Sequence, residues 1–92
     1  MVDPELAVLI PGFLEEAVHR CESLLEQAGV DDFIAAGETV HKLIGLGGSY
    51  GFDKITELAR NVEQAVDARN STEISHIAGE LKSYIYRLKR NL

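Results

Sequence analysis

Four segments of this chain carry apolar residues at intervals of three and four, the spacing that places side chains on one face of an α-helix. The connections between the segments are short, so consecutive helices should run in opposite directions. The pattern predicts an all-α fold, an antiparallel up-down-up-down four-helix bundle. The first segment spans Phe13–Ala28, the second runs from Asp31 to about Gly48, the third starts at Asp53, and the fourth follows the turn 70–72.

Turn and cap residues mark the expected ends of these helices. A short extra helix is expected over residues 3–10, laid against one end of the bundle and interrupted by Pro11-Gly12. Gly29 is expected to end the first long helix in a left-handed conformation. Asp31 and Asp32 place negative charge at the start of the second helix. Asp53 is expected to cap the third helix.

Length and charge limit what the chain can bind. Its 92 residues form one domain, residues 1–92. The net charge of −6 argues against nucleic acid, whose phosphates bind Lys and Arg. No apolar stretch approaches the ~20 residues of a membrane span, and the N-terminus does not resemble a signal peptide. The single Cys21 excludes an internal disulfide, fits a reducing cytoplasm and reads as a small core residue.

His41 is the side chain best placed for chemistry. At about 100° per residue, Val40 and Leu43 lie on the apolar stripe, and His41 points about 100° away from its middle. Its neighbours on the helix surface are Gly37, Gly45 and Gly48. Each glycine in a helix costs roughly 0.5–1 kcal/mol relative to alanine. A large partner that must reach the imidazole would explain them. The alternative is that the glycines let helices pack closely and that His41 is an ordinary boundary histidine.

Glu63 is expected to lie on the same shoulder of the third helix that His41 occupies on the second. If these helices pack antiparallel, its carboxylate can reach the imidazole. A carboxylate that accepts a hydrogen bond from Nδ1–H would leave Nε2 free as a nucleophile near neutral pH. The alternative is that Glu63 pairs with a surface Arg or Lys.

The remaining residues argue against an independent enzyme. There is no phosphate-binding P-loop, no histidine pair four residues apart and no His/Cys cluster, so we expect no metal and no cofactor. The chain is too small to hold a nucleotide-binding domain beside the bundle. Two other functions stay open. One is a helical adaptor that binds a signalling partner without phosphorylation, and the other is an acid–base enzyme, which would lack a visible substrate pocket.

The segment His41–Phe52 resembles the signature of histidine-containing phosphotransfer (HPt) domains of bacterial two-component phosphorelays. The matching residues are His41, Leu43, Gly45, Gly51 and Phe52. Ile44 stands where Lys is common in the family, and Leu46 where a small polar residue is common. The resemblance covers roughly residues 4–90, including the Asp-Pro-Glu-Leu start and the run 58–63.

This resemblance implies a four-helix bundle that acts as a phosphocarrier without kinase activity of its own. His41 would accept a phosphoryl group from the aspartate of a receiver domain, in a response regulator or a hybrid histidine kinase, and return it to another receiver. The receiver would supply Mg²⁺. Glu63 matches the family position 22 residues after the histidine, where Glu or Gln orients the imidazole.

The resemblance also implies a docking surface around His41. Gly37, Gly45 and Gly48 would provide steric clearance, with Gly45 the critical one. Ile34, Ile44 and Lys42 would contact the partner. The family lysine that helps to neutralise the phosphoryl group is replaced by Ile44, and Lys42 points to the other side of His41. We expect a monomer that binds neither nucleic acid nor membrane.

Overall fold

The computed structural model describes residues 9–91, which form four helices and contain no strand. The all-α prediction is therefore confirmed. The helices are α2 (Ile10–Gly29), α3 (Phe33–Tyr50), α4 (Asp53–Asp67) and α5 (Ser71–Arg90). None of these helices is long and apolar enough to cross a bilayer. The short helix expected over residues 3–10 lies mostly outside the described residues.

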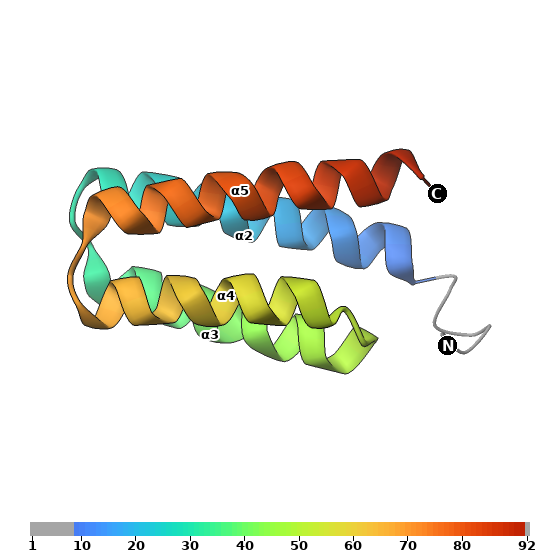
Figure 1. Ribbon diagram of the computed structural model, residues 1–92, viewed down its shortest axis with the longest axis horizontal. Helices are drawn as coiled ribbons and strands as arrows, with labels where there is room; N and C mark the ends of the chain where they lie inside the picture. The colour runs from blue at the N-terminus through green and yellow to red at the C-terminus, as the bar shows by residue number, and fades with distance from the viewer. Residues whose placement is uncertain (1–8, 92) are drawn as a thin grey trace.

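The four helices lie side by side along a body measuring 40 × 20 × 16 Å. Each helix packs against two others, so that α2 and α5 form one pair and α3 and α4 the other. Figure 1 shows these pairs as two layers, with the three connections at alternate ends of the bundle. The connections cover only 30–32, 51–52 and 68–70, which is too short for any crossover along the bundle.

Aliphatic side chains from all four helices fill the centre of the bundle. The largest fully buried ones are Leu14, Leu24, Leu43, Ile55, Ile74, Leu81 and Ile85. Cys21 is buried among them, as expected, and this burial raises the pKa of its thiol to about 12. At neutral pH the thiol is protonated, so Cys21 behaves as a small apolar residue.

The structure corrects the expected break at Pro11-Gly12. Helix α2 starts at Ile10 and runs through both residues. Pro11 stands at the start of the helix, where its missing N–H has no partner to lose and its fixed φ angle suits the helix. The break expected here therefore does not occur, because a proline disrupts a helix only after its first turn.

Two of the expected helix ends are also wrong. Gly29 is the last residue of α2, and the left-handed residue in the loop is Asp31, with φ 56°. Asp32 caps α3, its Oδ1 accepting a hydrogen bond from the Ala35 N–H at 3.1 Å. Asp53 is the first residue of α4 and does not cap it, since Phe52 occupies the cap position without a side-chain hydrogen bond.

The C-terminal end of α3 lies two residues later than expected and is packed against α2 by stacked aromatic rings. The helix continues past Gly48 to Tyr50, and Gly51 then ends it with φ 76°, a conformation that suits glycine. Phe13 of α2 stacks on Tyr50, with ring centroids 4.4 Å apart, and on Phe52 at 5.2 Å. These contacts fix α3 lengthwise against α2.

The phase of α3 can be tested by comparing two neighbouring side chains. Leu43 has no exposed surface, whereas His41 is exposed. Leu43→Ala should lower the free energy of unfolding by roughly 2–5 kcal/mol, because it leaves a cavity in the core. His41→Gln should change it by less than about 0.5 kcal/mol. Urea titration measures both values, and equal losses would mean that His41 also packs in the core.

Candidate functional site

His41 lies on α3, exposed beside the stripe that packs into the bundle. Ala36, Val40, Leu43 and Gly47 of this helix are buried, as the spacing predicted. Within residues 9–91, no hydrogen bond or ion pair engages the His41 side chain. An imidazole in such a position is open to solvent and to a partner.

A shallow hollow between α3 and α4 contains both His41 and Glu63. Packing of these two helices therefore brings together the two residues that the sequence analysis paired. Glu63 is half-buried, and no hydrogen bond joins it to His41 in the described part of the chain. Its role in orienting the imidazole stays a prediction. Ile34 and Gly37, two further residues of the expected docking surface, also line the hollow.

Ile34 is 80% exposed at the edge of this hollow. The structure places the other two expected docking residues, Ile44 and Lys42, outside it. Ile44 is only partly exposed and packs against the core. Lys42 is exposed but does not line the hollow.

The glycines of α3 divide into two kinds. An added Cβ at Gly45 or Gly48 would meet no atom of a neighbouring element within 4 Å, so neither glycine is needed for packing among the described residues. At Gly37 a Cβ would lie 3.8 Å from Val66 Cγ1, an ordinary contact. At Gly47 it would lie 2.5 Å from Thr56 Oγ1 and 3.1 Å from the Thr56 nitrogen. Gly47 is thus the glycine that lets α3 and α4 pack closely.

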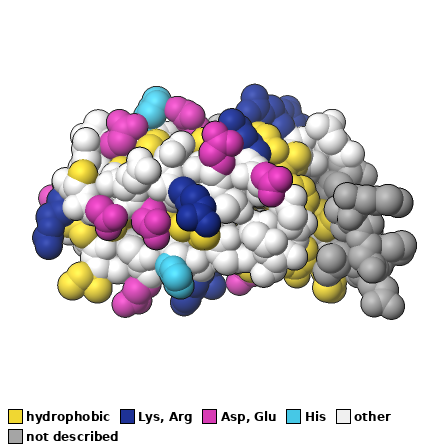
Figure 2. Space-filling view, turned by 60° about the horizontal axis from the view of Figure 1, so that its bottom comes forward, with side chains coloured by type: hydrophobic (Ala, Val, Ile, Leu, Met, Phe, Trp, Pro, Cys, Tyr) yellow, Lys and Arg dark blue, Asp and Glu magenta, His cyan; other side chains and the backbone are white. Residues whose placement is uncertain are grey.

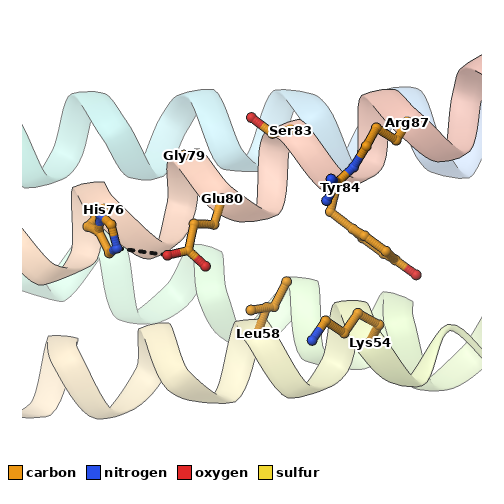
Figure 3. Close-up of a pocket in the computed structure, with 8 residues that line it drawn as sticks. All are labelled: Lys54, Leu58, His76, Gly79, Glu80, Ser83, Tyr84 and Arg87. Atoms are coloured by element: carbon orange, nitrogen blue, oxygen red, sulfur yellow. Dashed lines mark ion pairs between the residues drawn. The ribbon is translucent and has the colours of Figure 1, made fainter.

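The other two histidines are engaged by glutamates. His76 Nε2 lies 2.7 Å from Glu80 Oε1, four residues along α5, and His19 Nδ1 lies 3.5 Å from Glu22 Oε1 on α2. Figure 3 shows His76 directed toward Glu80 in a groove between α4 and α5, which Lys54 and Leu58 border from the α4 side. These pairings distinguish His41 from both.

The sequence analysis missed two acidic residues beside His41. Glu38 and Asp67 line the same hollow as His41 and Glu63. Helical spacing could have identified both, because Glu38 lies three residues before His41 and Asp67 four residues after Glu63. Figure 2, which faces the α3–α4 side, shows acidic and basic side chains interspersed beside a wide area of uncharged surface.

No group of three His, Cys, Asp or Glu side chains that could hold a metal ion occurs within residues 9–91.

Comparison with known proteins gives one match. The family model described as Hpt domain matches residues 9–91, which is nearly the whole chain. No curated protein and no solved structure matches.

The two kinds of glycine should respond in opposite ways to alanine. Gly45→Ala should raise the free energy of unfolding by about 0.4–1 kcal/mol, because the site is open and alanine restricts the unfolded chain. Gly47→Ala should lower it by about 1–3 kcal/mol, because the new Cβ collides with Thr56. Urea titrations of the two variants measure the difference, and a loss at Gly45 would show that this glycine has a packing role.

Proposed function

Because the chain belongs to the Hpt domain family, we propose that it is a phosphorelay intermediate whose acceptor is His41. Members of the family are phosphocarriers rather than kinases. His41 takes a phosphoryl group from the aspartyl phosphate of one receiver domain and donates it to the aspartate of another. The receivers belong to response regulators or hybrid histidine kinases, and the relay operates in the bacterial cytoplasm with this chain as a monomer.

The observation that carries this proposal concerns His41 and its neighbours within residues 9–91. His41 is exposed there, has no hydrogen-bond or ion-pair partner, and lies next to glycines at which an added Cβ would meet no neighbouring atom. The side chain is exposed, and the positions of Gly45 and Gly48 open onto empty space. A helical adaptor would gain nothing from this clearance. A phosphocarrier needs it, because the active site of a receiver must approach the imidazole closely enough for in-line attack on phosphorus.

The proposed chemistry uses few groups of this chain. The unprotonated Nε2 of His41 attacks phosphorus, the N–P bond forms, and the bond from phosphorus to the receiver's aspartate oxygen breaks. Glu63 accepts a hydrogen bond from Nδ1–H, which holds the ring and stabilises its positive charge as the N–P bond forms. The receiver supplies Mg²⁺ and most of the charge compensation in the transition state. This division of labour suits a chain with Ile44 where the family lysine is common.

The receiver docks over α3 and the hollow beside it. Ile34 is the exposed apolar contact, and Gly37, Gly45 and Gly48 leave room for the receiver's loops. Lys42 contributes at the edge. Apolar contacts at the centre of such a surface with charges at its rim are common in protein interfaces.

The acceptor is tested by labelling with a phosphorylated receiver domain. The wild-type chain should gain an acid-labile, alkali-stable phosphate, as expected for a phosphoramidate, and His41→Gln should gain none. The variants His19→Gln and His76→Gln are matched controls, because both histidines are exposed on other helices, and both should label normally. Labelling that persists in His41→Gln would show that His41 is not the acceptor.

The docking role of the clearance is tested by Gly45→Gln. The fold should tolerate this change, since the site is open, but transfer from a receiver should be at least about tenfold slower, because a side chain one turn from His41 blocks the approach. Labelling by a small phosphodonor such as phosphoramidate should be unchanged, since it needs no docking. Transfer at the wild-type rate would mean that the receiver does not approach across Gly45.

A further inference from the structure

Three carboxylates line the same hollow between α3 and α4 as His41. Glu38 comes from the same helix, and Glu63 and Asp67 come from α4. Within the described residues no Lys or Arg lines this hollow. The surroundings of His41 are therefore anionic, although the group it is proposed to carry is an anion as well.

Helical geometry places the flanking carboxylates close to His41. Glu38 lies three residues before His41, a spacing at which Cβ atoms are about 5–6 Å apart. Asp67 lies one turn beyond Glu63 and borders the same hollow. Both Glu38 and Asp67 are exposed, so they act on His41 through solvent.

The basic residues nearest to these carboxylates along the chain do not line the hollow. Lys42 and Arg60 are exposed and lie outside its lining. Arg69 stands over the ring of Phe33, 5.8 Å from its centroid, and lines an adjacent hollow. No cation of the described residues therefore lines the hollow that the phosphoryl group on His41 would face.

Phosphorylation adds negative charge at His41, the same sign of charge that these carboxylates carry. The phosphoryl group brings two negative charges, and a ring that keeps its Nδ1 proton offsets one of them. The net change is one negative unit, or two where the proton leaves. Each nearby carboxylate then raises the free energy of the phosphorylated form relative to the unmodified form.

Resting on the proposed function, we propose that Glu38 and Asp67 raise the transfer potential of phosphorylated His41 and so bias the chain toward donation. In that step the N–P bond breaks, the receiver's carboxylate oxygen bonds to phosphorus, and His41 is left as neutral imidazole with its Nδ1 proton. The repulsion ends when the phosphoryl group leaves. The chain thus passes the group on rather than storing it.

This effect is distinct from a change in docking. A weaker or stronger contact with the receiver changes the forward and reverse rates by the same factor and leaves the equilibrium constant between free proteins unchanged. Charge beside the phosphoryl group changes the equilibrium constant itself. Moreover, the variant-to-wild-type ratio of equilibrium constants must be the same for every receiver, since the receiver's own free energies cancel.

The experiment measures this constant for transfer from a phosphorylated receiver to His41. The double variant Glu38→Gln/Asp67→Asn should raise it about two- to fivefold at an ionic strength of roughly 0.01 M, where screening is weak. The gain should vanish at about 1 M salt, where charges are screened within about 3 Å. Two unrelated receivers should give the same ratio.

Glu57→Gln provides the matched control. Glu57 is exposed on α4 and lies outside the hollow, six residues before Glu63 and hence about 9 Å away along the helix axis. The equilibrium constant for transfer from a phosphorylated receiver to His41 should be the same in Glu57→Gln as in the wild type. Glu63 is left unchanged, because its loss would also remove the proposed hydrogen bond to the imidazole.

Two results would overturn the inference. One leaves the proposed phosphocarrier function standing, and the other overturns that function as well. If the wild type accepts phosphate at His41 but the double variant leaves the constant unchanged, the carboxylates do not set the transfer potential and the phosphocarrier role stands. If the wild type never accepts phosphate at His41, the proposed function fails together with the inference.

Discussion

The close packing of α3 against α4 is the constraint on which the site depends. Gly47 lets the two backbones approach, since a Cβ there would lie 2.5 Å from Thr56 Oγ1. Val40 and Leu43 bury the inner face of α3, which leaves His41 on its exposed shoulder. Because α4 lies directly alongside, Glu63 and Asp67 reach the same hollow. One helix contact therefore sets both the exposure of the imidazole and the charges around it.

His41 lies on a helix that is fixed at both ends, and the glycines next to it on that helix carry no side chain. Helix α3 is capped by Asp32 at one end and held at the other by the stacking of Tyr50 and Phe52 on Phe13. The helix cannot easily slide or rotate, so the imidazole keeps its place. At Gly45 and Gly48 an added Cβ would meet nothing within 4 Å in the part of the chain that the structure describes. A carrier that is reached by different partners needs this combination, because positioning lowers the entropic part of the transfer barrier while clearance admits the partner.

Several errors of the sequence analysis share one physical origin. Pro11, Gly29 and Asp53 were each read as residues that end or cap a helix, and in the structure each lies within one. A proline near the first turn, a glycine at the last position and an aspartate at the first helical residue are all compatible with helix geometry. Which of two adjacent positions becomes the cap depends on how the neighbouring helices pack, as at Phe52, whose ring stacks on Phe13.

The periodicity of apolar residues determined the four helices and their inner faces, because burial of an apolar stripe outweighs local preferences. It also placed His41 outside the core. The resemblance of the segment His41–Phe52 to the HPt signature predicted the family that the Hpt match confirms. The sequence could not distinguish Gly47 from Gly45 and Gly48, because a glycine that permits packing and one that clears a surface look alike until the neighbouring helix is present. Nor did it bring Asp67 to His41, since Asp67 lies on α4, whose approach and rotation only tertiary packing decides. Glu38, three residues before His41 on the same helix, was within reach of helical spacing and was missed.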